Sequence, residues 1–284
     1  MEEKKKPIYS FSRLSCFDEC KYQYYLNYVL PKDERPINED NAFNLYGSFV
    51  HELLEKYSKG ELASWDLLDH YVDEFDIQVN KDFPPNSFVD LRDSYYNDGY
   101  AFLEGFDGFD DDYETIGVEQ YFVSDFGDFK LRGFIDLILR DKKTGGIVVQ
   151  DWKSKSKFAS KREQMEYARQ PYLYSKYIHD KYGVWPEKLR FYMFRKDLIV
   201  DIPFTMDGYE EAVTWAKNQA KKIEDNIDED RGWACRGDVE TKDGQLNFFC
   251  NFLCGFRNSC QFAVKVREDI RAKAEALNTP TTEV

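Results

Sequence analysis

Hydrophobic residues in the first hundred positions recur at intervals of three and four, which is the spacing of one face of an α-helix. This pattern predicts four helices, over residues 10–29, 41–57, 64–75 and 88–106. A polar segment separates the first two helices, and Gly60 marks the end of the second. We therefore expect residues 1–112 to form a largely helical N-terminal region.

The pattern changes after this region to short runs rich in β-branched and aromatic residues. These runs are separated by turns rich in Gly, Asp and Lys, and they predict three antiparallel strands over residues 116–123, 129–139 and 146–152. The elements predicted next are a helix at 161–182, strands at 189–194 and 198–204, and an amphipathic helix at 208–227. We expect an α/β core at 113–228, an irregular cysteine-rich segment at 229–275 and a disordered tail at 276–284.

Composition narrows the class of protein. With 284 residues, 42% of them hydrophobic and 17% aromatic, the chain can bury one sizeable core or two small ones. It contains no apolar stretch of the roughly 20 residues that span a membrane, and its first residues do not resemble a signal peptide. We expect a soluble cytoplasmic protein of a bacterial, archaeal or phage-infected cell, with no membrane association.

The net charge of −14 argues against non-specific binding to nucleic acid. Basic residues nevertheless gather between positions 153 and 162, so a basic groove on an acidic body is compatible with the sequence.

Acidic residues interrupt two of the predicted strands. Asp136 lies inside an apolar strand, and Asp151 and Lys153 lie two residues apart, on one face of the next strand. A hairpin can bring the two carboxylates within reach of one metal ion, and oxygen ligands of this kind suit Mg²⁺ or Mn²⁺. Lys153 could position an attacking water or stabilise charge on a phosphate. The alternative for each acid is a structural salt bridge.

The cysteines form a second chemical feature. Two lie near the start of the chain and four near its end: Cys16, Cys20, Cys235, Cys250, Cys254 and Cys260. Disulfides are rare in the cytoplasm, so clustered cysteines there indicate a metal or iron–sulfur site.

The order of Asp136, Asp151 and Lys153 resembles the PD-(D/E)xK nuclease superfamily, in which an Asp on one strand precedes an Asp/Glu-x-Lys on the next. Three segments resemble its RecB/AddB and CRISPR-associated adaptation nuclease branch. They are a Gly-x-x-x-His-x-x-Leu-Glu helix at 47–55, a Gln-x-x-x-Tyr pair at 170–174, and an opening segment at 9–20 that ends in Cys. A core histidine and an ordinary buried tyrosine are the alternatives for the first two.

The resemblance implies a restriction-endonuclease-like α/β fold, with a central mixed sheet flanked by helices, a helical N-terminal region and a cysteine-rich iron–sulfur lobe that joins the two chain ends. It also implies a metal site formed by His51, Asp136, Asp151 and the backbone carbonyl of Trp152, with Glu119 as a further contact. A solvent-facing strand acid is the alternative for Glu119.

The remaining site residues follow from the same resemblance. Lys153, Gln170 and Tyr174 are expected to act with Asp136 and Asp151 in catalysis, and Lys155 and Lys157 to contact DNA. A solvated run of charge is the alternative for the last two lysines.

A [4Fe-4S] cluster is implied on Cys20, Cys250, Cys254 and Cys260. Three residues rather than the usual two separate Cys250 from Cys254, so Cys16 and Cys235 remain alternative ligands. Zinc and unliganded buried cysteines are the other interpretations.

Together these expectations describe a metal-dependent DNA nuclease, an exonuclease acting on single-stranded DNA ends. The expected settings are recombination, repair, phage replication or CRISPR adaptation, with a protein partner in one of these processes. The alternatives are a DNA-end-binding or partner-docking subunit with little turnover and a zinc-stapled regulator without nuclease activity.

Overall fold

The computed structural model describes residues 6–229 and 232–278, which divide into two units. The first, here called the sheet unit, comprises Met1–Leu14 and Ala42–Asp225. The second, the cysteine unit, comprises Ser15–Asn41 and Asn226–Val284. The region 1–112 therefore contributes to both units.

A six-stranded mixed sheet forms the centre of the sheet unit. Its strands are β1 (Ile8–Tyr9), β2 (Tyr113–Asp125), β3 (Lys130–Asp141), β4 (Ile147–Lys153), β5 (Lys188–Met193) and β6 (Leu198–Pro203). Strand β3 pairs with β2 along one edge and, along the other, with β1 at its start and β4 at its end. The β1–β3 and β4–β5 pairs are parallel and the others antiparallel. The predicted strands are confirmed, whereas β1 is too short to leave a sequence pattern.

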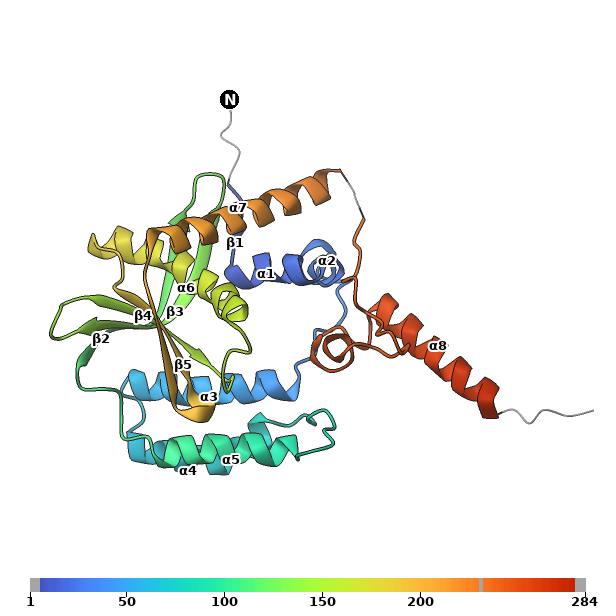
Figure 1. The fold of residues 1–284 in the computed structure, drawn as a ribbon, viewed down its shortest axis with the longest axis horizontal. Helices are drawn as coiled ribbons and strands as arrows, with labels where there is room; N and C mark the ends of the chain where they lie inside the picture. The colour runs from blue at the N-terminus through green and yellow to red at the C-terminus, as the bar shows by residue number, and fades with distance from the viewer. Residues whose placement is uncertain (1–5, 230–231, 279–284) are drawn as a thin grey trace, which may run out of the picture. The chain divides into compact units, whose positions relative to one another are not determined.

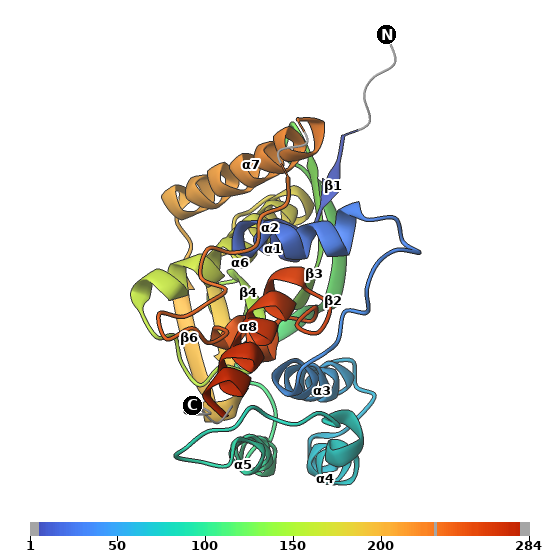
Figure 2. The same cartoon turned by 90° about the vertical axis from the view of Figure 1, so that its right-hand side faces the viewer.

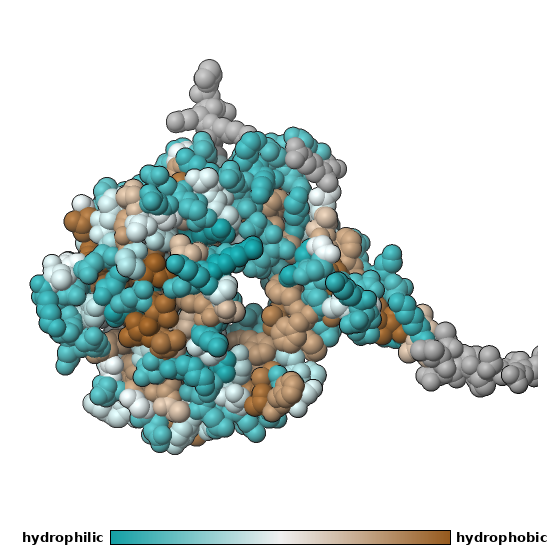
Figure 3. Space-filling view, in the orientation of Figure 1, coloured by the Kyte–Doolittle hydropathy of each residue, from teal (hydrophilic) through white to brown (hydrophobic). Residues whose placement is uncertain are grey.

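Helices cover both faces of this sheet (Figures 1 and 2). One face carries α3 (Ala42–Ser58), with α4 (Leu67–Gln78) and α5 (Leu91–Glu104) packed beyond it; the other carries α6 (Lys161–Tyr182) and α7 (Met206–Asp228). In the view of Figure 3, hydrophilic residues cover most of the visible surface, and a patch of hydrophobic residues lies over the strands.

Helix α6 illustrates how local sequence sets an element that positions the site. The Ser160 side chain accepts a hydrogen bond from the backbone N–H of Glu163, and the Glu163 carboxylate accepts one from the N–H of Ala159. This arrangement satisfies the free N–H of Glu163 in the first turn and fixes the chain just before the helix. Gly183, with a φ of 74°, ends the helix in the left-handed conformation that glycine adopts without strain. The helix makes the long crossover that parallel β4 and β5 require.

Helix α3 is held against the sheet by its apolar face. Phe49, Val50, Leu53 and Leu54 are buried in one core with Leu137, Val148 and Trp152 of the strands. The three- and four-residue spacing of the helical residues is the predicted one. Replacing a buried leucine of such a core by alanine costs about 2–5 kcal/mol, so the orientation of α3, and of the polar side chains it presents, is strongly fixed.

The predicted helix over residues 10–29 is wrong in detail. It is divided into α1 (Phe11–Glu19), α2 (Lys21–Tyr24) and a π-helical turn at Tyr25–Val29. Cys20, with a φ of −156°, interrupts the helix because it serves as the N-cap of α2, and its Sγ accepts a hydrogen bond from the Gln23 N–H.

The C-terminal segment is also more regular than expected, because helix α8 occupies Gln261–Asn278. This helix extends through residues 276–278 of the predicted tail, and the rest of the tail, 279–284, lies outside the described residues. Within the described part of the chain, no helix has both the length and the apolar character needed to cross a bilayer.

Candidate active site and cysteine centre

The candidate site is built where β2 and β3 deviate from regular pairing. Val118 pairs with Leu137 and Gln120 with Ile135, which places Glu119 opposite Asp136. Glu119 has a φ of 45°, in the left-handed region that costs a non-glycine residue about 1–3 kcal/mol. Strain of this size is typical of functional positions.

At the kink at Glu119, the side chains of β2 change the face of the sheet to which they point. Val118 packs into the α3 core, whereas the Gln120 side chain accepts a hydrogen bond from Lys181 of α6, on the opposite face. In a regular strand, residues two apart share a face. The carboxylates of Glu119 and Asp136 therefore lie at the position along the two strands where the side chains switch faces.

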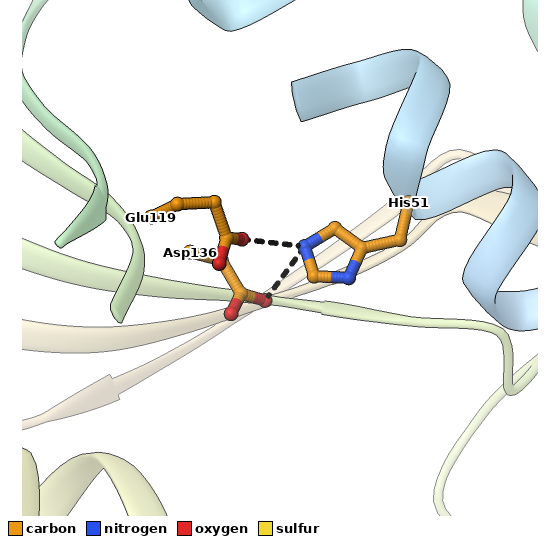
Figure 4. Close-up of side chains that lie close together, drawn as sticks. All are labelled: His51, Glu119 and Asp136. Atoms are coloured by element: carbon orange, nitrogen blue, oxygen red, sulfur yellow. Dashed lines mark ion pairs between the residues drawn. The ribbon is translucent and has the colours of Figure 1, made fainter. Parts of the chain in front are cut away.

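His51 reaches these two carboxylates from α3 (Figure 4). Its Nε2 lies 3.0 Å from Glu119 Oε1 and 3.7 Å from Asp136 Oδ2. Among the described residues, this is the only group of three or more His, Cys, Asp or Glu whose ligand atoms all lie within 4.8 Å of one another.

The donor set fits a divalent metal ion. The buried His51 Nε2 and Glu119 Oε1 face each other as an ion pair at 3.0 Å, and one ligand atom from each of His51, Glu119 and Asp136 lies within 4.8 Å of the other two. One imidazole nitrogen and two carboxylate oxygens are donors that Mn²⁺ accepts, and the carboxylates also suit Mg²⁺.

Electrostatics at the site are those of crowded carboxylates. The pKa of Asp136 is raised to about 7. Burial and then the nearby Asp151 raise it, while His51, Lys153 and a hydrogen bond from the Trp152 N–H oppose the rise. Burial lowers the pKa of His51, but the carboxylates of Glu119 and Asp136 outweigh burial and raise it overall. A cation between these groups would stabilise their charged forms.

Asp151 and Lys153 lie on β4 beside this group. Asp151 is buried, and its Oδ2 lies 2.6 Å from the Lys153 ammonium. Burial lowers the pKa of Lys153, but the attraction of Asp151 and Asp136 outweighs it, so the pKa lies above its usual value. Of the three side chains expected to bind the metal, the structure groups His51 and Asp136 with Glu119, while Asp151 is paired with the lysine.

Gln170 and Tyr174 lie on α6 and form a pair. The Gln170 Nε2 donates a hydrogen bond to the Tyr174 hydroxyl at 3.1 Å. Gly133 of β3 makes room for this hydroxyl, since a Cβ at that position would lie 2.8 Å from it.

The other predicted residues take varied positions. Trp152 donates its backbone N–H to Asp136 at 2.8 Å, and its indole packs against Phe109 and Tyr192 in the core. Lys155 is paired with Glu163 at 2.8 Å, so part of its charge is neutralised locally, whereas Lys157 is exposed.

Close packing explains why Gly47 of the Gly-x-x-x-His segment is a glycine. A Cβ on Gly47 would lie 3.1 Å from the Ser154 Oγ, just after β4, so glycine allows α3 to approach this strand closely. The approach brings His51, one turn further along α3, to the carboxylates.

The cysteine unit gathers sulfur atoms from both ends of the chain. Cys20 Sγ lies 3.7 Å from Cys235 Sγ, and the Cys235 thiol also interacts with Cys250 and Cys260. Cys254 borders the same apolar pocket, and all six cysteines are free of disulfides. The four predicted ligands therefore share one pocket, together with Cys235.

Cys16 takes a different position. It does not line this pocket, and its sulfur accepts a hydrogen bond from the Asn27 side chain.

Sequence reasoning gave Glu119 and Cys235 secondary roles. The strand register could have drawn attention to Glu119, because it lies opposite Asp136 in the hairpin. For Cys235 the sequence held no comparable signal, since 215 positions separate it from Cys20.

Residues 8–261 match the family model of the PD-(D/E)XK nuclease superfamily. The chain belongs to this superfamily. PD-(D/E)XK nucleases use divalent metal ions, and the His51, Glu119 and Asp136 group is a site suited to one. The mixed sheet flanked by helices is consistent with the PD-(D/E)XK fold.

Two solved structures resemble the chain distantly. One, named "Putative exonuclease" and from Eubacterium rectale, is 14% identical, with a TM-score of 0.44 over 81% of this chain and 84% of its own. The other, SSO0001, is 16% identical, with a TM-score of 0.30 over 88% of this chain and 94% of its own. No curated protein sequence shows significant similarity to the chain.

Proposed function

We propose that this PD-(D/E)XK protein is a metal-dependent deoxyribonuclease that hydrolyses phosphodiester bonds, with His51, Glu119 and Asp136 as ligands of Mg²⁺ or Mn²⁺. The observation that carries the proposal is the convergence of the buried His51 Nε2 and Glu119 Oε1 on the carboxylate of Asp136. Asp151, whose place on β4 follows the Leu137–Gln150 pair and so lies opposite Asp136, remains a predicted further ligand.

The chain's own residues have separate tasks in this mechanism. When bound, the ion lowers the pKa of a water molecule and neutralises phosphate charge. Lys153 orients the attacking water and stabilises negative charge that develops on the phosphate. Asp151 holds the lysine ammonium in place, and the Trp152 N–H holds the carboxylate of Asp136.

We further propose that the substrate is DNA, attacked from an end in its single-stranded form, in recombination, repair, phage replication or CRISPR adaptation. The support is the pair of motifs that resemble the RecB/AddB and CRISPR-associated branch. His51 of the first motif faces the carboxylates, and Gln170 and Tyr174 of the second are hydrogen-bonded to each other.

The test is cleavage of end-labelled single- and double-stranded DNA with Mn²⁺, Mg²⁺ or EDTA. We expect metal-dependent products, and a rate about 10²- to 10³-fold lower for Lys153→Met, which removes a charge aimed at the reacting phosphate. Lys143→Met, a change at an exposed lysine of the β3–β4 turn, is the matched control. Wild-type cleavage by Lys153→Met would refute the mechanism, and DNA binding without cleavage by the wild type would favour the end-binding subunit.

For the cysteine unit we propose a [4Fe-4S] cluster. The supporting observation is that the four predicted ligands, Cys20, Cys250, Cys254 and Cys260, line one apolar pocket and form no disulfide.

Backbone N–H groups near the sulfur atoms give further support. They are directed at Cys20, Cys254 and Cys260, as is common around cluster ligands. Iron, acid-labile sulfide and zinc analysis of anaerobically purified protein tests the proposal. Stoichiometric zinc without iron would contradict it.

A further inference from the structure

Two large aromatic side chains remain exposed next to the candidate metal site. Tyr121 of β2 and Phe134 of β3 are 49% and 53% exposed, and their rings lie 5.2 Å apart. They form the strand pair immediately after Gln120 and Ile135, and so lie two residues beyond Glu119 and Asp136. A cross-strand pair stabilises a hairpin modestly, but rings of this size are usually buried.

The pair lies on the face of the hairpin from which His51 approaches. Its neighbours Phe122 and Gly133 face α6, because the Phe122 ring packs on Tyr174 and Gly133 borders the Tyr174 hydroxyl. Successive side chains alternate between faces. Tyr121 and Phe134 therefore point to the face on which α3 packs, the helix that carries His51, but they lie beyond its cover and stay exposed.

A basic residue continues the same row. Arg132 lies two residues before Phe134 on β3, hence on the same face, and pairs across the hairpin with Val123, which is also exposed. Arg132 is exposed and has no ion-pair partner in the described part of the chain. At about 3.4 Å per residue, Phe134 lies about 7 Å and Arg132 about 14 Å from Asp136 along the strand.

The row therefore presents, in order, metal ligands, two aromatic faces and a guanidinium. This is the chemistry that binds an extended single strand, whose bases stack on aromatic rings while its phosphates contact basic groups. Duplex DNA keeps its bases stacked on one another, so exposed rings of this kind offer it little.

We propose that Tyr121 and Phe134 form a stacking platform for the bases of single-stranded DNA next to the metal site, and that Arg132 contacts a phosphate of the same strand. The proposal rests on the proposed nuclease function and adds a binding subsite to it. It assigns a role to three exposed residues that take no part in metal binding.

The experiment measures binding of fluorescently labelled single-stranded oligonucleotides with Ca²⁺ in place of the catalytic ion. Phe134→Ala and Tyr121→Ala should each weaken binding about tenfold, whereas Phe134→Trp, which keeps an aromatic face, should bind like the wild type. Phe88→Ala, at a phenylalanine that is 96% exposed and distant in sequence from the hairpin, is the matched control and should bind normally.

A second arm uses oligonucleotides with abasic positions near the end. The wild type should bind these oligonucleotides about tenfold more weakly than intact ones. Phe134→Ala should bind intact and abasic strands equally weakly, because removing either the ring or the base removes the same stacking contact. Arg132→Gln should reduce the dependence of log affinity on log salt by about one phosphate contact.

The outcomes separate this inference from the function on which it rests. A wild type that cleaves DNA, with alanine variants that bind intact and abasic strands as it does, would overturn the stacking platform and leave the nuclease assignment standing. A folded wild type that neither binds nor cleaves DNA would overturn both.

Discussion

Replacing Asp136 with asparagine should make the metal-free protein more stable at alkaline pH while abolishing metal binding. The asparagine keeps an oxygen that can accept the Trp152 N–H but carries no charge to desolvate. In the wild type, burial and the neighbouring Asp151 make ionisation of Asp136 unfavourable. The carboxylate would thus be retained for function at a cost in stability.

The magnitude follows from the shift in pKa. The pKa of Asp136 rises from 3.8 to about 7 in the folded protein. Each unit is worth about 1.4 kcal/mol, so full ionisation costs the folded state up to about 4 kcal/mol. The folded state holds this proton more tightly than the unfolded chain, so the wild type should lose stability as the pH rises from about 4 to about 7 and lose no more above it.

The assay is urea unfolding in EDTA at pH 4.5 and pH 8, followed by tryptophan fluorescence. Four of the five tryptophans lie in the sheet unit, so the signal reports mainly on the unit that contains the site. Asp136→Asn should exceed the wild type in stability at pH 8 and approach it at pH 4.5. Added Mn²⁺ should stabilise the wild type and leave the variant unchanged.

A control with the opposite sign lies on the same strand. Hydrogen bonds from the backbone N–H groups of Thr144 and Lys143 lower the pKa of Asp141, so Asp141→Asn should not stabilise the protein at pH 8. Equal stability of wild type and Asp136→Asn at pH 8 in EDTA would refute the electrostatic reasoning.

Two further predictions concern packing and the cysteine unit. Gly99→Ala should destabilise the protein by about 1–3 kcal/mol in urea unfolding, because the new methyl group would overlap a buried tyrosine hydroxyl. Gly105→Ala, which has its nearest contact at 3.5 Å, should change stability by less than about 0.5 kcal/mol. Cys235→Ser should lose iron, because this thiol interacts with three of the predicted ligands. Loss of iron in Cys254→Ser but not in Cys235→Ser would instead support the ligand set that the resemblance implies.

The sequence determined the elements whose signals are local. Helix α6 spans the predicted residues 161–182, and Ser160 and Gly183 set its ends, because a cap and a left-handed glycine act within a few residues. The β-rich runs located the strands of the core. Asp136, Asp151 and Lys153 stood out because charged groups are unusual in apolar strands, whatever the fold around them.

Tertiary structure decided the features that depend on residues far apart in the chain. Glu119 joins His51 and Asp136 through the register of β2 on β3 and through its own left-handed backbone conformation, which cannot be read from the residue type. Cys20 breaks its predicted helix and meets Cys235 across 215 positions. Local patterns record propensity and amphipathic faces, whereas burial, strand register and the convergence of side chains are fixed only when distant segments pack together.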